Sequence, residues 1–330
     1  MHLFFVSVLL VCGFPFIMTD VVGSFSTCSE FFFNKQPPTI RGILENSVSK
    51  DQNQYKIICQ QNQNKYRFAT FYDIKNKIPL FSAYKYTGHT GTRPQNVKWK
   101  TEPQLEDQNA GMNVALSNQA FKGDYTTNKD VNRGHLFPCC HAADEDTAKS
   151  TFTLTNAVPQ YKSFNGGSWS DMEQKVRSVM DSHCRDKNNE KNILAYVLTG
   201  AVPNTKRPPQ LLNNRVNIPS DMWTVFCCYN RESNKWKSQA HWAENKDESK
   251  GSKPIPPKTL VALQTFLKSK YNKESLLFNG GCLDDLKADA SPPPVPDTCE
   301  ELDDEQQSWW TYIKDIPAQI WRTIIDWLRG

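Results

Sequence analysis

The sequence lacks any segment that repeats at a fixed period, which argues against solenoid and propeller architectures. It also lacks a CxxC pair followed by a second pair of metal ligands, so a structural zinc site is not expected. Its last apolar segment, residues 309–328, contains four charged residues, whereas a bilayer span needs about 20 largely uncharged ones. A transmembrane helix is therefore not expected there.

What is present is a chain of 330 residues with an ordinary apolar fraction of 38% and many Asn, Gln, Ser and Thr residues. This length suits one large domain with appendages or two small domains. The composition predicts a loop-rich α+β fold, but by itself it indicates no chemistry.

The first 23 residues are predicted to be a secretory signal peptide, which places the protein outside the cell. An apolar run from Leu3 to Val11 is followed by Val21 and Gly23, three residues and one residue before a suitable cleavage point. The positive charge at the start is limited to the amino terminus and His2. An uncleaved membrane anchor is the alternative interpretation.

The cysteines support export. Of ten in the chain, Cys12 lies in the predicted signal peptide. The nine that remain are Cys28, Cys59, Cys139, Cys140, Cys184, Cys227, Cys228, Cys282 and Cys299. Such scattered cysteines in an exported chain predict disulfide bonds. Because nine is odd, at least one is unpaired, pairs between chains, or lies in a segment that is removed.

The C-terminal end differs from the body in charge. Residues 291–296 form a proline-rich linker, and residues 297–330 carry eight acids and three bases in a chain of net charge +4. The body is thus basic, which suits a polyanionic partner or serves solubility alone. Residues 309–328 predict an amphipathic helix that contacts a membrane surface or a partner, or docks on its own domain.

Alternation and apolar runs predict the strands of an antiparallel sheet. The predicted strands are residues 55–59, 66–72, 78–84, 193–200 and 222–229. Residues 27–41 are expected to form an ordered arm tied down by a disulfide through Cys28, and residues 87–130 a long surface excursion. Residues 257–271 predict a helix with one apolar face.

The most informative stretch is residues 131–173. Its pattern predicts a strand ending at 132–135, a second strand at 151–158 and a helix at 168–180. In that order of strand, strand and helix, His135 at a strand end faces Asn165 at the helix start across a small cleft.

The residue types in this stretch suit phosphodiester hydrolysis. His135 can accept a proton from water near neutral pH, and the amide oxygen of Asn165 suits Mg²⁺. Glu173 can accept hydrogen bonds near the metal, and Arg133 can contact a phosphate or a neighbouring carboxylate. Asn156 is expected to orient the other groups. Taken singly, each assignment is weak, because such residues are more often turn or surface residues.

Taken together, the motifs NRGH, TNAVPQ and FNGGSW with the position of Glu173 resemble the DNA/RNA non-specific endonucleases of the ββα-metal class. The resemblance covers most of residues 68–229. It implies an α+β fold with a central antiparallel sheet flanked by helices and long loops. It also implies His135 as the general base, Asn165 as the ligand of Mg²⁺ or Mn²⁺, and Arg133, Asn156 and Glu173 as supporting residues. The implied substrates are DNA and, as a second candidate, RNA.

One position departs from the family motif. The family carries Asp at the first position, whereas this chain has Asn132, which removes a negative charge beside Arg133. Two interpretations follow: a secreted metal-dependent nuclease formed by residues 24–290, or a catalytically weak relative that binds nucleic acid or a protein partner. A third is an adhesion protein that uses its C-terminal helix. The oligomeric state is not predicted.

Overall fold

A computed structural model describes residues 20–89, 93–107, 114–126 and 128–287. Its centre is an eight-stranded sheet in the order β1-β5-β6-β7-β10-β13-β14-β16. All neighbouring pairs are antiparallel except β14 and β16, which are parallel. The strands are β1 Asp20–Val22, β5 Tyr55–Asn62, β6 Lys65–Asp73, β7 Ile78–Tyr86, β10 Ala195–Val202, β13 Asp221–Asn230, β14 Lys235–Glu244 and β16 Asp284–Asp285.

The sheet is buried on both faces. All ten residues of β13 are buried, and side chains that point to opposite faces belong to two separate apolar cores. Because successive side chains in a strand alternate between faces, a nearly continuous apolar run is the pattern that a doubly covered strand requires. The five predicted strands are confirmed within a few residues at each end, whereas β14 was not predicted.

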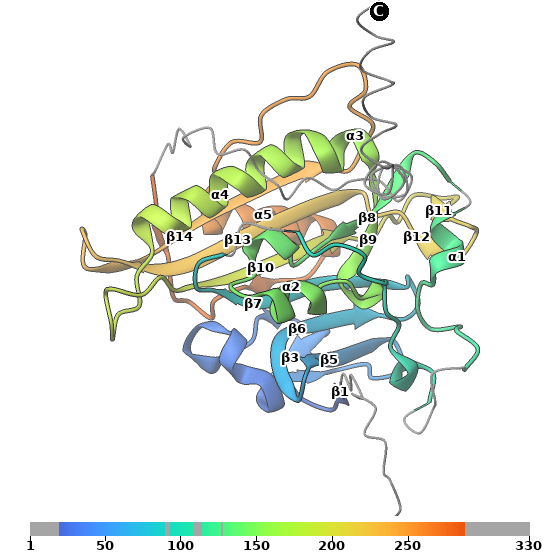
Figure 1. Cartoon of the computed structure of the whole chain (residues 1–330), viewed down its shortest axis with the longest axis horizontal. Coiled ribbons are helices and arrows are strands. Elements are labelled where there is room, and N and C mark those ends of the chain that lie inside the picture. Colours follow the sequence, from blue (N-terminus) through green and yellow to red (C-terminus); the bar gives the residue numbers. More distant parts are fainter. Residues whose placement is uncertain (1–19, 90–92, 108–113, 127, 288–330) are drawn as a thin grey trace, which may run out of the picture.

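One face of the sheet, toward the viewer in Figure 1, is covered by α4 and by a separate hairpin of β8 and β9. The elements of this layer are β8 Val131–His135, α2 Glu145–Ser150, β9 Ala157–Tyr161, α3 Lys162–Phe164, a π-helix Asn165–Trp169 and α4 Ser170–His183. Met172, Val176 and Val179 of α4 are buried in this core. We call this layer the front layer.

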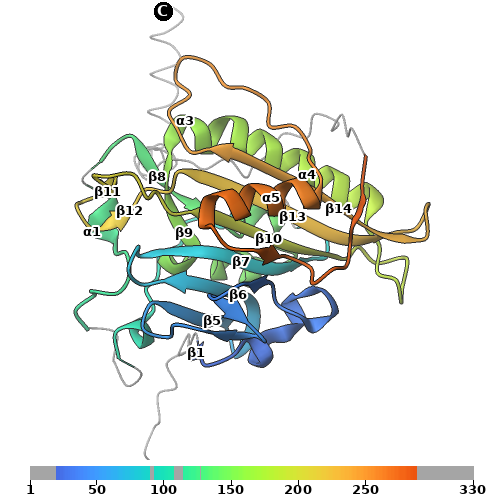
Figure 2. The same cartoon turned by 180° about the vertical axis from the view of Figure 1, so that it is seen from behind.

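The opposite face, shown in Figure 2, is covered by α5 Leu260–Tyr271 and by the N-terminal arm. The predicted late helix is thus confirmed, although it begins at Leu260 behind the N-cap Thr259, whose side chain accepts a hydrogen bond from the Ala262 amide. The arm contains 3₁₀ helices Phe25–Phe31 and Phe33–Lys35 and is tied to β5 by the Cys28–Cys59 disulfide, as predicted. We call this layer the back layer.

Minor elements complete the described part of the chain. A second sheet has the order β15-β2-β3-β4, and β11 pairs with β12. The short strands are β2 Thr39–Ile40, β3 Leu44–Glu45, β4 Val48–Ser49, β11 Leu211–Leu212, β12 Val216–Asn217 and β15 Ser275–Leu276. The remaining short helices are α1 Lys122–Tyr125 and the 3₁₀ turns Pro103–Leu105, Cys139–His141 and Leu154–Asn156.

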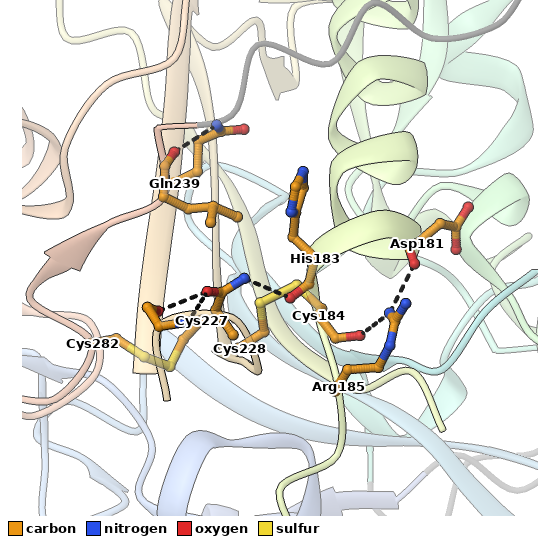
Figure 3. The surroundings of a disulfide bond; sticks show 11 residues. Asp181, His183, Cys184, Arg185, Cys227, Cys228, Gln239 and Cys282 are labelled. Atoms are coloured by element: carbon orange, nitrogen blue, oxygen red, sulfur yellow. Dashed lines mark hydrogen bonds between the residues drawn. A yellow bond between two sulfur atoms is a disulfide. The ribbon is translucent and has the colours of Figure 1, made fainter. Parts of the chain in front are cut away.

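Two disulfides attach the two layers to adjacent residues of β13. Cys228 bonds to Cys184 directly after α4 in the front layer, and Cys227 bonds to Cys282 in the back layer. Figure 3 shows the two bonds side by side, with Arg185 donating to the carbonyls of Asp181 and Cys184. Because adjacent side chains of a strand point to opposite faces, these two cysteines of β13 attach both layers to the sheet.

The structure corrects the predicted strand at residues 151–158. Thr151 is the C-cap of α2, a 3₁₀ turn follows at Leu154–Asn156, and β9 begins only at Ala157. The Thr151 hydroxyl donates to the Ala148 carbonyl, and the Asn156 amide donates to the Thr153 carbonyl. Local bonds of this kind from Ser and Thr compete with strand pairing.

The predicted excursion at 87–130 contains only short helices in its described parts. The predicted linker and C-terminal helix, and residues 1–19 of the predicted signal peptide, lie outside the described residues. The remainder of that segment includes β1, which pairs with β5, so cleavage after Gly23 would remove an edge strand. Within the described ranges, no helix is long and apolar enough to cross a membrane.

Candidate active site

The β8–β9 hairpin positions the first group of site residues. Its register pairs Asn132 with Gln160, and Gln160 is fully buried against Gly134. A Cβ on residue 134 would lie 1.9 Å from the Gln160 side-chain oxygen, so this position requires glycine. Strand alternation places Arg133 and His135 on one face and Asn132 on the other.

His135 lies in an aromatic environment on that face. Its side chain is 5% exposed, and its ring centre lies 4.8 Å from that of Trp99 and 4.9 Å from that of Phe152. The Arg133 guanidinium lies 5.2 Å from the centre of the Trp99 ring. Trp99 therefore contacts both residues and limits the rotamers that His135 can adopt.

Asn165 is the first residue of the π-helix, between α3 and α4. Two glycines follow it, and Gly167 has φ −107° and ψ −119°, outside the helical region. Such wide turns occur in short pieces inside α-helices, and they leave backbone groups outside the usual pattern. Asn165 itself is 6% exposed and lies beside the cavity described below.

Glu173 follows on the first turns of α4. The Trp169 indole donates a 2.9 Å hydrogen bond to Glu173 Oε1 and so fixes the carboxylate. The Glu173 carbonyl lies 3.2 Å from His141 Nε2, while the Tyr84 hydroxyl contacts His141 Nδ1 at 2.9 Å. Burial, with the nearby Arg177 as a smaller cause, lowers the pKa of His141 to about 3. His141 is therefore a neutral wall residue at ordinary pH.

A single cavity with about 520 Å³ of empty space, part of it open to solvent, joins these elements. Three of the five predicted site residues, His135, Asn165 and Glu173, line it. The other lining residues are Arg93, Pro138, Cys139, Cys140, His141, Ser170, Gln174 and Arg177. The predicted approach of His135 and Asn165 across a cleft is thus present in the structure.

The other two predicted site residues do not line the cavity. Arg133 lies between the rings of Trp99 and Tyr125, at 5.2 and 5.8 Å. Asn156 is fully buried, accepts a 3.0 Å hydrogen bond from the Phe137 amide, and donates to the Phe137 carbonyl at 3.1 Å. Asn156 therefore holds the chain two residues after His135 and contributes to the scaffold of the site.

Two arginines in the cavity wall were not singled out from the sequence. Arg93 is 8% and Arg177 is 7% exposed. A desolvated guanidinium is costly unless an anion or a set of acceptors faces it, so arginines at a cavity suit a phosphate. Arg177 follows Glu173 at helical i,i+4 spacing, a signal that the sequence does contain. Arg93 lies in the polar excursion, where no periodic pattern marks it.

The vicinal cysteines lie in the same wall. Cys140 is disulfide-bonded, and its sulfur lies 3.8 Å from the sulfur of Cys139, beyond the length of an S–S bond. Arg93 Nη1 lies 3.9 Å from Cys139 Sγ. The disulfide of Cys140 therefore does not join the two adjacent residues.

The donor set fits a hard divalent cation held by few protein ligands. Asn165 and Glu173 offer oxygens to the cavity, and Mg²⁺ prefers oxygen ligands while it keeps several waters. In the described part of the chain, no group of three or more His, Cys, Asp and Glu side chains could hold a metal.

The chain is similar in sequence to known proteins. Human "Endonuclease domain-containing 1 protein" is 29% identical over 221 residues, and the mouse protein of the same name is 28% identical over 217. Each alignment covers 62% of this chain but 39% of the relative, so the chain spans about two-fifths of their length. The crystal structure of an EndoG/EndoGI complex overlaps with a TM-score of 0.47 at 16% identity, covering 77% of this chain and 91% of that one.

The sequence model described as "DNA/RNA non-specific endonuclease" matches residues 49–279, which include the whole β8–β9 hairpin, the π-helix and α4. The mixed α+β architecture and the strand, strand, helix order of the site are those predicted for the ββα-metal class. This chain belongs to the DNA/RNA non-specific endonuclease family.

Proposed function

We propose that this protein is a secreted, Mg²⁺-dependent endonuclease that hydrolyses the phosphodiester bonds of DNA, and of RNA as a second substrate, with little sequence preference. One observation carries the proposal. A proton acceptor, two residues with oxygen donors and two buried arginines, which come from three separate segments of the chain, line the same cavity. Each residue type matches one requirement of phosphodiester hydrolysis.

His135 is the general base. It takes a proton from a water molecule, the oxygen of that water attacks phosphorus, and the bond from phosphorus to the leaving oxygen breaks. The leaving oxygen takes up a proton from solvent. The contacts of His135 with Trp99 and Phe152 fix its ring, so the proton acceptor does not need to be oriented during the reaction.

Asn165 would hold the cation through its amide oxygen, and Glu173 would accept hydrogen bonds from water bound to it. When bound, Mg²⁺ stabilises the negative charge that develops on the phosphate and on the leaving oxygen. The bond from Trp169 keeps Glu173 oriented. Mn²⁺ is an alternative ion, because it accepts the same oxygen donors.

Arg93 and Arg177 bind the phosphate oxygens. Such contacts carry no base information, which accounts for cleavage with little sequence preference. Arg133 lies outside the cavity wall, stacked on Trp99, so its role is to hold that ring against His135 and to contact the nucleic acid backbone.

Asn132 favours a second candidate, a weak or inactive relative that binds nucleic acid or a protein. One observation argues against a loss of turnover: strand alternation places position 132 on the face opposite His135, next to Gln160. The missing carboxylate therefore lies away from the proposed base.

Export and domain organisation complete the proposal. The apolar first segment and three disulfides in the described chain support secretion. We infer that residues 24–290 form the nuclease domain, that residues 291–296 are a linker, and that residues 297–330, with the acidic run and the amphipathic helix predicted there, mask the basic cleft or contact a membrane surface. Removal of residues 297–330 is expected to raise the affinity for DNA.

Incubation of the purified protein with supercoiled plasmid, in Mg²⁺ and in EDTA, tests the activity. Nicking in Mg²⁺ that stops in EDTA supports the nuclease. Binding of DNA without cleavage at any pH from 5 to 8 would instead support the second candidate.

A further inference from the structure

A loop from late in the chain forms hydrogen bonds with the segment that carries Asn165. The loop follows β14 and comprises residues 245–251. Its first residue is buried and attaches it to β9, because Asn245 Nδ2 donates to the Pro159 carbonyl at 3.0 Å and Asn245 Oδ1 accepts from the Tyr161 amide at 3.1 Å. Segments more than eighty residues apart in sequence are thus joined immediately before the π-helix.

Two further residues of the loop, Asp247 and Glu248, bind α3. The Ser163 hydroxyl donates to Asp247 at 2.6 Å and accepts a 2.7 Å hydrogen bond from the Glu248 amide. The bond from Ser163, followed by those from Ser249, lowers the pKa of Asp247 to about 2. The Ser163 hydroxyl therefore donates to one residue of the loop and accepts from the next.

Glu248 then reaches the π-helix itself. Its carboxylate accepts a 2.9 Å hydrogen bond from the Ser168 hydroxyl on Oε1 and a 3.3 Å bond from the Ser168 amide on Oε2. Ser168 is 2% exposed, and a Cβ at the neighbouring Gly167 would lie 3.3 Å from Glu248 Oε2. The carboxylate fits directly against the glycine backbone.

We call the hydrogen bonds that join Asp247 and Glu248 to Ser163 and Ser168 the clamp. The clamp lies beside the part of the chain whose backbone has the most conformational freedom. Two successive glycines follow Asn165, and glycine loses more conformational freedom on folding than any other residue. A π-helix is also an unfavourable backbone conformation, and it persists only where contacts with surrounding residues stabilise it. The bidentate acceptor supplied by Glu248 is such a contact, and it belongs to no sequence motif of the site.

We propose that Glu248 is a positioning residue for Asn165: it fixes the π-helix and thereby sets the affinity of the site for its divalent cation. The inference rests on the proposed function, because it takes Asn165 as the metal ligand. Glu248 does not line the cavity and acts only through Ser168.

Two measurements on the full chain test the proposal. The first is hydrogen exchange of residues 162–170 without metal, compared with residues 131–135 as an internal reference. The second is Mn²⁺ affinity from electron paramagnetic resonance, which needs no catalysis. The variants are Glu248→Ala, Glu248→Gln and, as a control, Glu244→Ala, the exposed last residue of β14, whose carboxylate pairs with Lys246 of the loop.

Glu248→Ala is expected to speed exchange in residues 162–170 and to weaken Mn²⁺ binding about 10- to 100-fold, the usual effect of losing an outer contact of a metal ligand. Glu248→Gln keeps one acceptor for the Ser168 hydroxyl and is expected to fall between wild type and Glu248→Ala. Glu244→Ala should match wild type in both measurements.

Unchanged exchange in Glu248→Ala would overturn the clamp, and faster exchange with unchanged Mn²⁺ affinity would overturn its link to the metal. If the wild type itself bound no Mn²⁺, the metal site of the proposed function and the link to it would both be refuted. The exchange measurement would still decide on the clamp.

Discussion

The front and back layers of this protein cover the same sheet in different ways. The back layer is closed by aromatic packing, with the ring centre of Phe25 4.9 Å from that of Phe32 and 5.9 Å from that of Phe81. The front layer instead buries polar and charged groups, among them Asn156 and Arg177. Apolar packing stabilises without orienting a ligand, whereas buried polar groups orient one at a cost in desolvation.

The difference has a structural consequence. The front layer carries the cavity, and its polar groups depend on distant partners: Asn156 on Phe137, Glu173 on Trp169, and the π-helix on the loop after β14. The back layer contributes none of the residues that line this cavity. Changes in the front layer should therefore alter activity more than stability, and changes in the back layer the reverse.

The largest effect is expected from His135→Ala. Loss of a general base typically costs about 10²- to 10⁴-fold in rate. The rate of plasmid nicking measures this, with His183→Ala as a matched control, because His183 lies at the far end of α4 and does not line the cavity. Equal losses in the two variants would contradict the assignment of His135.

The next effect concerns the arginines. Arg177→Gln removes a charged donor, whose hydrogen bonds are worth about 1.5 to 3 kcal/mol, and should raise the KM for DNA about 10- to 100-fold. The slope of log binding constant against log salt concentration should also decrease in magnitude by about 1, because one phosphate contact is lost. Lys175→Gln, an exposed position on the same helix, is the control and should change KM little. An unchanged KM in Arg177→Gln would remove Arg177 from the phosphate site.

The two disulfides of β13 give the most direct comparison of the layers. Replacing either pair with serines, Cys184 with Cys228 or Cys227 with Cys282, should lower the free energy of unfolding by about 2 to 5 kcal/mol in guanidinium titrations. Only loss of the front pair should also reduce nicking, because that bond anchors the end of α4, which carries Glu173 and Arg177. Equal nicking by both double variants would show that this anchor does not matter for the site.

The smallest effect is on pH dependence. The pKa of His141 is lowered from 6.5 to about 3 in the folded state. Between these two pH values the unfolded chain therefore binds a proton at His141 that the folded chain does not bind. Stability from this group is present above pH 6.5 and is lost as the pH falls toward 3, with a limiting slope of about 1.4 kcal/mol per pH unit. His141→Gln should flatten that slope in urea titrations between pH 7 and 5. A slope identical to that of wild type would rule out this contribution.

The sequence predicted much of this arrangement. Apolar runs located five sheet strands, and residue chemistry together with the family resemblance indicated His135, Asn165 and Glu173, which line one cavity. Local patterns suffice where a strand is buried on both faces or where a helix has one apolar face. They did not reveal β14, where Trp236 and Trp242 alternate with charged and polar residues.

The remaining features depend on contacts between distant segments. Residues 151–156 resemble a strand in composition, but the Thr151 hydroxyl bonds to the Ala148 carbonyl and the Thr153 and Thr155 hydroxyls contact each other. Arg93 reaches the cavity from an excursion without periodic structure, and Glu248 grips the π-helix from beyond β14. No local pattern encodes such contacts, because they are defined only when the sheet has formed.

The proposed role of His135, hydrolysis of nucleic acid in the cavity between β8 and α4, calls for one decisive measurement: binding and cleavage of the same duplex DNA, in Mg²⁺, by wild type and His135→Ala. Both proteins should bind with similar affinity, and only the wild type should cleave. Equal cleavage by the two proteins, or binding without cleavage by the wild type, would contradict it.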